Sequence, residues 1–339
     1  MSDQPPLRAR GLLRRLTGVQ IVGTGSYVPE QVVRNEDLAA LGYDADWIIQ
    51  RTGIRERRHA PKEMATSDMA IAAARRCMEQ AAASPADIDL VLLATLSPDH
   101  LLPASACVVQ DRLGLNCPAA DIQAACAGFL YALITGMQYV ATGCSNLALV
   151  IGADTNSRVM NPADKKTYPL FGDGAGAVLL ARGEDDQGMV SYTLGADGSG
   201  LDLLYRPTGG SRMPYDRTVT DQASHFVLMD GRPVFKWAIR LLEDTVRDVL
   251  EAAGQSVDDV DLWVLHQANL RIIEAAMQNI GIRRDRVAIH LDRYGNTSAG
   301  SVPIALDESA RAGQIQRGST ILMSGFGAGL SWGTAVFRW

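Results

Sequence analysis

The second half of the chain repeats part of the first half. The segment SPADIDLVLL at Ser84–Leu93 matches SVDDVDLWVL at Ser256–Leu265, at an offset of 172 residues (256 − 84). Each segment is a polar turn followed by an apolar run, which is the pattern of a buried strand. A chain of 339 residues has room for two such units. The repeat therefore predicts a duplicated fold.

Strands and helices alternate along both units. Apolar runs between turn residues predict strands, and apolar residues at helical spacing predict helices. The expected strands are 19–25, 88–95, 121–124, 148–153, 171–180, 261–265, 287–290, 320–325 and 334–337, and the expected helices are 68–83, 104–113, 127–133, 234–253, 270–280 and 299–310. This alternation predicts an α/β fold with mostly parallel sheets covered by helices and with sites at the carboxyl ends of strands.

The chain divides into an arm and two halves. We predict a flexible N-terminal arm at residues 1–17, an N-terminal half at 18–185 and a C-terminal half at 186–339. The arm is rich in arginine, but no apolar stretch follows before Gly23, so it does not have the pattern of a secretory signal.

Composition and cysteine spacing exclude several classes of protein. The net charge of −6 does not suggest a nucleic-acid partner, and no apolar run reaches the length of a membrane span. The cysteines show neither paired spacing nor the spacing of zinc ligands; they are Cys77, Cys107, Cys117, Cys126 and Cys144. We therefore expect free thiols in a reducing cytoplasm, no metal site, and no nucleic-acid or membrane partner.

Cys126 is the candidate nucleophile. It lies in the segment 121–133, between a short strand and an apolar helix, and its neighbours are small. The positive end of a helix dipole favours a thiolate, which is the form that attacks thioesters. From this segment alone, Cys126 could equally be a small buried apolar residue, as many free cysteines are.

The repeat points to two further turns that could carry functional residues. An offset of 172 carries Cys126 to Ser298, beside Asn296 in the turn Gly295–Gly300. His266 follows the repeated apolar strand directly, where ligand sites form in α/β sheets. The glycine motif FGDGAG near residue 174 also has a counterpart in GFGAG near residue 327, at a shifted offset of 153. A core histidine and a plain helix cap remain the alternatives for His266 and Asn296.

Cysteine, histidine and asparagine together suit one chemistry. The thiolate takes an acyl group from a thioester, and the two other side chains donate hydrogen bonds to the carbonyl oxygen of a second thioester. Those bonds stabilise the enolate that forms when a malonyl carboxylate leaves as CO2. This chemistry needs no metal or organic cofactor. The backbone N–H of Cys126 and one from the turn Gly325–Gly329 would hold the tetrahedral oxyanion.

The sequence resembles the 3-oxoacyl-[acyl-carrier-protein] synthase III family from about Thr17 to Trp339. The resemblance rests on the motifs WIIQRTGIRERR, AACAGF, FGDGAGAV, HQANLRII, GNTSAGSVPIAL and GFGAGLSWG, in that order. It implies a thiolase-like fold of two pseudo-symmetric halves in five layers, α-β-α-β-α, and a homodimer. It also implies an acyltransferase that condenses an acyl-CoA primer, acetyl-CoA or another short acyl-CoA, with malonyl-carrier protein. The products would be 3-oxoacyl-carrier protein, CO2 and CoA, at the start of fatty-acid synthesis.

The resemblance also implies roles for single residues. It matches Cys126, His266 and Asn296 to the family's catalytic triad, and Phe326 to an aromatic side chain that favours loss of the carboxylate. The positions matched to coenzyme A contacts are Trp47, Arg51 and Asn269, and those matched to carrier-protein docking are Lys236 and Arg271.

The chain departs from the family pattern at three places. Lys165 stands where an arginine usually stacks on the adenine of coenzyme A. Ala328 stands where a glycine supplies the second oxyanion N–H, which requires a backbone conformation that alanine can adopt. Gln278 and Asn279 replace a basic pair at the carrier-protein face, with Arg283 and Arg284 nearby.

Other members of the thiolase superfamily fit less well. Thiolases use a second cysteine late in the chain, but none follows Cys144, and elongating condensing enzymes have a histidine where Asn296 stands. The alternative that remains is a secondary-metabolite relative that loads an unusual starter or transfers an acyl group without decarboxylation. A non-catalytic acyl-binding protein is disfavoured by the complete triad. The primer's length and branching stay open, with Leu102 as a candidate residue of the acyl pocket.

Overall fold

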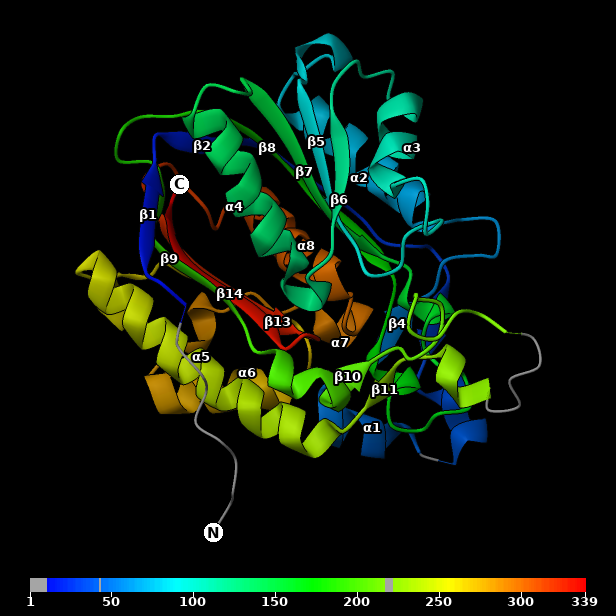
Figure 1. Ribbon diagram of the computed structural model, residues 1–339. Helices are drawn as coiled ribbons and strands as arrows, with labels where there is room; N and C mark the ends of the chain where they lie inside the picture. Colours follow the sequence, from blue (N-terminus) through cyan, green and yellow to red (C-terminus); the bar gives the residue numbers. More distant parts are fainter. Residues whose placement is uncertain (1–10, 43, 217–221) are drawn as a thin grey trace.

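Two β-sheets enclose a central pair of helices in the computed structural model, which describes residues 11–42, 44–216 and 222–339 (Figure 1). The central helices are α4 (Gly128–Ala141) and α8 (Ser301–Arg311). Helices α2 (Thr66–Gln80) and α3 (Ser105–Arg112) cover the outer face of the first sheet, and α5 (Gly231–Ala253) and α6 (Leu270–Ile280) cover the outer face of the second. This arrangement is the predicted five-layer α-β-α-β-α fold.

Each of the two large sheets has five strands. The first sheet runs β2-β8-β7-β5-β6, with strands Val19–Tyr27, Gly174–Arg182, Leu147–Asp154, Leu90–Ala94 and Ala119–Ile122. The second runs β1-β9-β14-β13-β12, with strands Arg14–Thr17, Gly188–Ala196, Ser331–Arg338, Thr320–Gly327 and Leu262–Leu265. Smaller elements are β3 (Val32–Arg34), β4 (Glu56–Arg58), β10 (Leu204–Tyr205), β11 (Leu228–Met229), α1 (Ala45–Thr52) and α7 (Leu291–Tyr294).

Both sheets are mixed, so the prediction of mostly parallel sheets is wrong. Strands β5, β6 and β7 are mutually parallel, as are β12 and β13, but β8 and β14 run antiparallel to their neighbours. The reason is the connection: no α-helix lies between β7 and β8 or between β13 and β14. Without a crossover helix, the chain returns antiparallel to the strand it has left.

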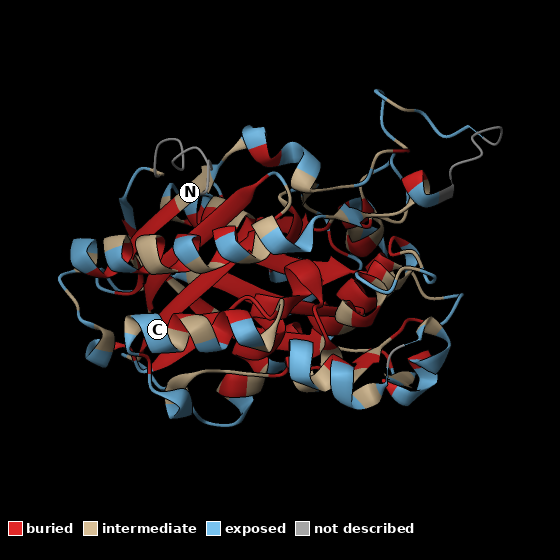
Figure 2. Ribbon diagram, turned by 90° about the horizontal axis from the view of Figure 1, so that it is seen from below, coloured by how far each residue is buried: buried red, intermediate tan, exposed pale blue. Residues whose placement is uncertain are grey.

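The central layer explains the apolar character of α4. Its buried residues include Phe129, Leu133 and Met137, and they pack in one cluster with residues of both sheets. Figure 2 shows the sheets buried beneath helices that are exposed only on their outer faces. A helix enclosed on both sides has little polar face to present, whereas α5 at the surface is amphipathic.

The predicted flexible arm is partly wrong. Arg14–Thr17 forms strand β1, which pairs antiparallel with β9 at the edge of the second sheet. Residues 1–10 of the predicted arm lie outside the described residues. Strand β1 thus belongs to the same sheet as the strands after residue 186.

The structural repeat is shifted by one residue at the site. The short 3-10 turn Ala125–Ala127 precedes α4, and the turn Ser298–Gly300 precedes α8 in the same way, at an offset of 173 (298 − 125). Ala125 (φ 46°) and Ser298 (φ 53°) share an unusual positive φ. Cys126 is therefore equivalent to Ala299, not to Ser298 as the sequence offset suggested.

Two other details of the predicted repeat are wrong. The expected strand 287–290 is reduced to one parallel bridge between Val287 and Trp263. The two glycine motifs are not equivalent either, because FGDGAG leads into β8 while GFGAG ends β13. In the strand order of the two sheets, β13 corresponds to β7 and β14 corresponds to β8.

Candidate active site

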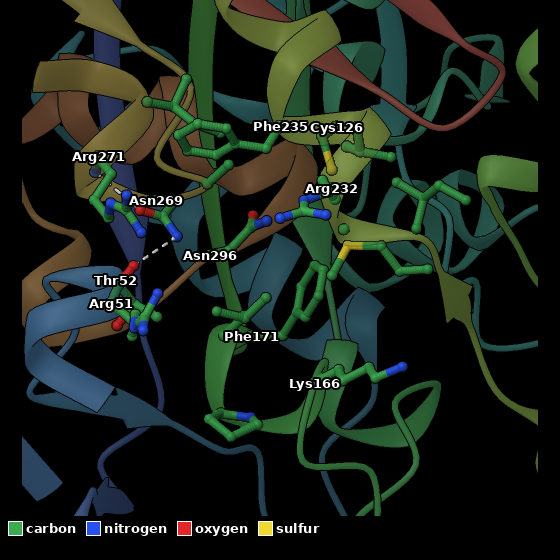
Figure 3. Close-up of a pocket in the computed structure, with 18 of the residues that line it drawn as sticks. Arg51, Thr52, Cys126, Lys166, Phe171, Arg232, Phe235, Asn269, Arg271 and Asn296 are labelled. Carbon is green, nitrogen blue, oxygen red and sulfur yellow. Dashed lines mark hydrogen bonds between the residues drawn. The ribbon is translucent and has the colours of Figure 1, made fainter. Parts of the chain in front are cut away.

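Three distant turns meet at one cavity of about 760 Å³. Cys126 precedes α4, His266 follows β12, and Asn296 lies between α7 and α8; all three line this cavity. Each is buried, with 7%, 2% and 5% of its surface exposed, respectively. Figure 3 shows Cys126 and Asn296 directed into the same space. The fold thus brings the predicted triad together.

Cys126 sits at the N-terminal side of the central helix. Its Sγ lies 3.4 Å from Ser298 Oγ, and the two groups form a hydrogen bond. Burial raises the pKa of the Cys126 thiol to about 12, while the bond to Ser298 lowers it. Loss of hydration thus opposes the thiolate that the N-terminus of a helix favours.

His266 is a neutral imidazole with defined partners. Its backbone N–H donates to the carbonyl of Ser324, which fixes the residue at the end of β12, and its Nδ1 lies 2.7 Å from Ser301 Oγ. Burial, with a smaller contribution from His290, lowers the pKa of His266 to about 3. At neutral pH the ring therefore carries one N–H and can donate one hydrogen bond without a charge.

The carboxamide of Asn296 is oriented by the backbone. Its Oδ1 accepts a hydrogen bond from the N–H of Ser298 at 2.8 Å, so the oxygen faces the turn and the NH2 group is left for the cavity. The backbone of Asn296 is also held on both sides, because its N–H donates to Leu170 and its carbonyl accepts from Gly172. Asn296 is thus a fixed donor beside the thiol.

The oxyanion prediction concerns the loop after β13. A methyl group built on Gly327 would lie 3.3 Å from Cys126 Sγ, so this backbone packs directly against the thiol. Ala328 borders a second cavity that Cys126 also lines. Among the described non-glycine residues only Ala82, Ala125 and Ser298 have positive φ, so Ala328 does not need a glycine conformation.

Phe326 lies against the active histidine. Its ring meets that of His266 edge to face, with the centroids 5.2 Å apart, and it also contacts Trp237. Both Phe326 and His266 line the first cavity. The cavity therefore has an apolar wall directly beside the imidazole of His266.

The mouth of the first cavity is basic and partly aromatic. Trp47 is 39% exposed there, and the guanidinium of Arg51 lies 5.6 Å from the centre of its ring. Lys165 and Asn269 line the same mouth, and Asn269 Nδ2 donates to the carbonyl of Arg51 (Figure 3). The three predicted coenzyme A contacts and Lys165 therefore line one cavity.

The two predicted docking residues occupy different positions. Arg271 lines the cavity mouth, with its guanidinium 5.6 Å from the ring of Phe235. Lys236 is exposed on α5 and does not line the cavity. The structure thus places Arg271 at the mouth of the first cavity and Lys236 on the exposed surface of α5.

A second cavity of about 310 Å³ reaches Cys126 from another side. Its lining is mainly apolar and includes Leu96, Val159, Met160, Phe171, Leu204 and Val227. Leu102, the predicted acyl-pocket residue, does not line it within this chain and is 88% exposed. The nucleophile therefore stands between a basic, wide cavity and a smaller apolar one.

Several residues at the site were not predicted from the sequence. Arg232 projects into the first cavity from the start of α5, as Figure 3 shows, and Lys166 and Phe171 also line it. Ser298 and Ser301 contact the triad through hydrogen bonds. The two serines lie inside the motif GNTSAGSVPIAL, but nothing in their spacing indicates which partner each one binds.

Two absences concern the described part of the chain. In residues 11–42, 44–216 and 222–339, no group of three or more His, Cys, Asp or Glu side chains is arranged to hold a metal ion. Within the same ranges, no helix combines the length and apolar character needed to cross a bilayer.

The sequence and the structure were compared with those of known proteins, and both have clear relatives. Family models of 3-oxoacyl-[acyl-carrier-protein] synthase III match residues 120–198, and those of its C-terminal part match residues 250–339. A beta-ketoacyl-[acyl-carrier-protein] synthase III from Rhodopirellula baltica is 53% identical, over 96% of this chain and 99% of the relative. The protein of that name from Caldanaerobacter subterraneus is 47% identical, over 94% and 97%. The crystal structure of 3-oxoacyl-[acyl-carrier-protein] synthase III from Aquifex aeolicus is 40% identical, with a TM-score of 0.87 over 95% of this chain and 100% of that one.

Proposed function

The chain belongs to the 3-oxoacyl-[acyl-carrier-protein] synthase III family, and on that premise we propose that Cys126, His266 and Asn296 carry its two half-reactions. The enzyme is an acyltransferase that condenses an acyl-CoA primer with malonyl-carrier protein to give 3-oxoacyl-carrier protein, CO2 and CoA, initiating fatty-acid synthesis. The secondary-metabolite alternative is not favoured by these relatives.

The first half-reaction is acyl transfer to Cys126. The sulfur attacks the thioester carbonyl of acyl-CoA to give a tetrahedral intermediate, whose collapse breaks the bond to the CoA sulfur and leaves the acyl–enzyme. The backbone N–H groups of Cys126 and Ala328 hold the oxyanion of the tetrahedral intermediate. The proton that the Cys126 thiol gives up is transferred to the CoA sulfur, so CoA leaves as the thiol and the step creates no net charge. The acyl chain then occupies the apolar cavity beside Cys126.

The second half-reaction is decarboxylation and condensation. The thioester oxygen of the malonyl group accepts hydrogen bonds from His266 and from the NH2 group of Asn296, which stabilise the enolate as CO2 leaves. The apolar ring of Phe326 disfavours the malonyl carboxylate and thus favours its loss. The carbanion then attacks the acyl group on Cys126, the bond to the sulfur breaks, and the released thiolate takes up one proton from solvent to restore the thiol.

The substrates would approach through the basic mouth. The adenine of coenzyme A stacks on Trp47 with Lys165 nearby, and the coenzyme's phosphates pair with Arg51. Asn269 lies along the path of the pantetheine arm. Lys236 and Arg271 receive the acidic carrier protein, whose prosthetic arm is the same pantetheine group. The proposed chemistry uses only these side chains and the two thioester substrates, in a homodimer in the cytoplasm.

One observation carries this proposal: a thiol, a neutral imidazole and a carboxamide donor, from three distant turns, share one buried cavity with a basic mouth. The test separates the two half-reactions. Cys126→Ala should abolish covalent labelling by radioactive acyl-CoA, whereas His266→Ala and Asn296→Ala should spare labelling and lower malonyl decarboxylation about 100-fold or more. A label retained by Cys126→Ala, or equal loss of both half-reactions in the other variants, would refute the assignment.

A further inference from the structure

We propose that Ser301 is a positioning residue that holds His266 in the tautomer with its proton on Nε2. The proposal deepens the assigned reaction and rests on it for its catalytic consequence, because decarboxylation needs a donor on the cavity side of this ring. The arrangement of the hydrogen bonds can be tested independently of any reaction.

The geometry identifies Ser301 as the donor in its hydrogen bond with His266. Ser301 Oγ lies 2.7 Å from His266 Nδ1, and both residues are buried, with 0% and 2% exposure. The backbone N–H of Gln267 reaches the same Oγ at 3.3 Å, and an N–H can only donate. The hydroxyl therefore accepts from Gln267 and keeps one proton to give. Among the described residues, the acceptor within hydrogen-bond distance of that proton is His266 Nδ1.

The tautomer follows from this bond. A nitrogen that accepts a hydrogen bond carries no proton, so the single proton of a neutral imidazole must be on Nε2. Burial keeps the ring neutral at physiological pH, since the pKa of His266 is lowered to about 3. The opposite tautomer would leave the proton of a fully buried hydroxyl without an acceptor. Ser301 thus directs the only N–H of the ring away from itself.

A buried network holds Ser301 in place. Its carbonyl lies 2.9 Å from His290 Nε2, which donates to it. The backbone N–H of His290 donates in turn to Gln267 Oε1 at 3.1 Å, and Gln267 Nε2 donates to the carbonyls of Leu265 and Ala288. This network fixes the backbone of Ser301, and turning the hydroxyl away would break its buried hydrogen bonds to His266 and Gln267. Ser301 is the first residue of α8, which fixes its direction further.

The first test reads the tautomer in the ligand-free enzyme. Nitrogen-15 NMR of protein labelled at histidine distinguishes the two tautomers by the shifts of the ring nitrogens, and the spectrum of His266→Gln identifies the signals of His266. We expect the Nε2–H tautomer in the wild type and a shift toward the Nδ1–H tautomer in Ser301→Ala. A wild-type ring protonated on Nδ1, or an unchanged tautomer in Ser301→Ala, would overturn the proposal. This readout needs no substrate, so it stands or fails separately from the proposed function.

The second test asks whether the tautomer matters for the reaction. Ser301→Ala should lower the rate of CO2 release from malonyl-carrier protein about 10- to 100-fold, because it removes one buried hydrogen bond that sets the donor. Acylation of Cys126 by acyl-CoA should stay within about twofold, and Ser301→Thr should restore decarboxylation because it restores the hydroxyl. Ser309→Ala is the matched control, since Ser309 is also buried on α8 but has no bond to His266. Equal loss of both half-reactions in Ser301→Ala would contradict the proposed role.

Discussion

Ser298 joins two members of the triad through a strained backbone. Its φ of 53° lies in the left-handed region, which non-glycine residues rarely adopt and which costs energy. In this conformation its N–H binds Asn296 Oδ1 and its hydroxyl reaches Cys126 Sγ. Ala125, beside the nucleophile, has the same unusual φ of 46°. The strain therefore lies on both sides of the reacting sulfur, where it sets the directions of the functional groups.

Buried histidines make the stability of the enzyme depend on pH. Burial and the charges of Arg57 and Arg158 lower the pKa of His59 to about 4. Above pH 6.5 the residue is neutral in both the folded and the unfolded chain, so it contributes no pH dependence there. As the pH falls from 6.5 toward 4, the unfolded chain takes up a proton that the folded protein does not, and stability is lost.

We therefore predict that His59→Asn flattens the acid limb of the stability curve. Between pH 7 and pH 5 the free energy of unfolding of the wild type should fall by about 2 kcal/mol more than that of the variant. Urea denaturation at a series of pH values measures this difference. His100→Asn, at an exposed histidine, should follow the wild-type curve. Parallel curves for wild type and His59→Asn would show that His59 is not the group responsible.

At the scale of elements, the site depends on how closely a strand and a turn approach. Gly152 of β7 faces the turn before α8, and a methyl group built on it would lie 2.2 Å from the carbonyl oxygen of Ala299. Only a residue without Cβ allows this contact. The approach brings Ser298 and Asn296 against the turn that carries Cys126. The glycine at position 152 thus sets how closely β7 approaches the turn before α8.

We predict that Gly152→Ala damages both stability and activity. The added methyl group must push the turn at Ala299 away, which should lower the free energy of unfolding by about 1–3 kcal/mol. Condensing activity should fall more than tenfold, because the donors would move away from the sulfur. Gly198→Ala is the control, since a methyl group there meets nothing within 4 Å. Thermal unfolding and the rate of condensation measure the two effects, and equal behaviour of the two variants would exclude the packing argument.

Strand β1 shows how an element outside the repeat completes a sheet. It covers the edge strand β9, and a methyl group built on Gly11 would lie 2.1 Å from the carbonyl oxygen of Leu194, so the chain before β1 also follows β9 closely. An uncovered edge strand presents unpaired backbone groups to other chains. β1 therefore protects the edge of the second sheet.

At the scale of the whole molecule, the first sheet has an edge of a different kind. Strand β6 pairs with β5 on one side only, and the loop that precedes α3 exposes Leu101 and Leu102 by 86% and 88%. Two neighbouring leucines exposed to this extent are expected at a protein–protein contact. We infer that the edge of the first sheet at β6, together with the loop before α3, forms the interface of the proposed homodimer.

The interface predicts the behaviour of a double variant. Leu101→Asp combined with Leu102→Asp should convert a dimer at micromolar concentration into monomers, because two charges would be buried without partners. Sedimentation velocity measures the change. Leu12→Asp introduces a charge at another exposed leucine, which is 70% exposed on the N-terminal arm, and should leave the dimer intact. A wild-type monomer, or a double variant that stays dimeric, would contradict the inferred interface.

The sequence by itself determined the layered α/β fold and the family, and it predicted the members of the candidate site. Apolar periodicity is a local property, so it predicted most helices and strands, and the duplicated segments with their motifs identified Cys126, His266 and Asn296. All three line one cavity, together with the residues predicted at its basic mouth.

Only the tertiary structure decided the partners of these elements and side chains. The antiparallel strands, the sheet that β1 joins, the one-residue shift of the repeat and the raised pKa of the Cys126 thiol all depend on residues far apart in the chain. So does the bond between Ser301 and His266, which joins residues 35 positions apart. The physical reason is that a local pattern specifies which face of an element is apolar, whereas pairing, desolvation and hydrogen-bond partners are set by what packs against that face.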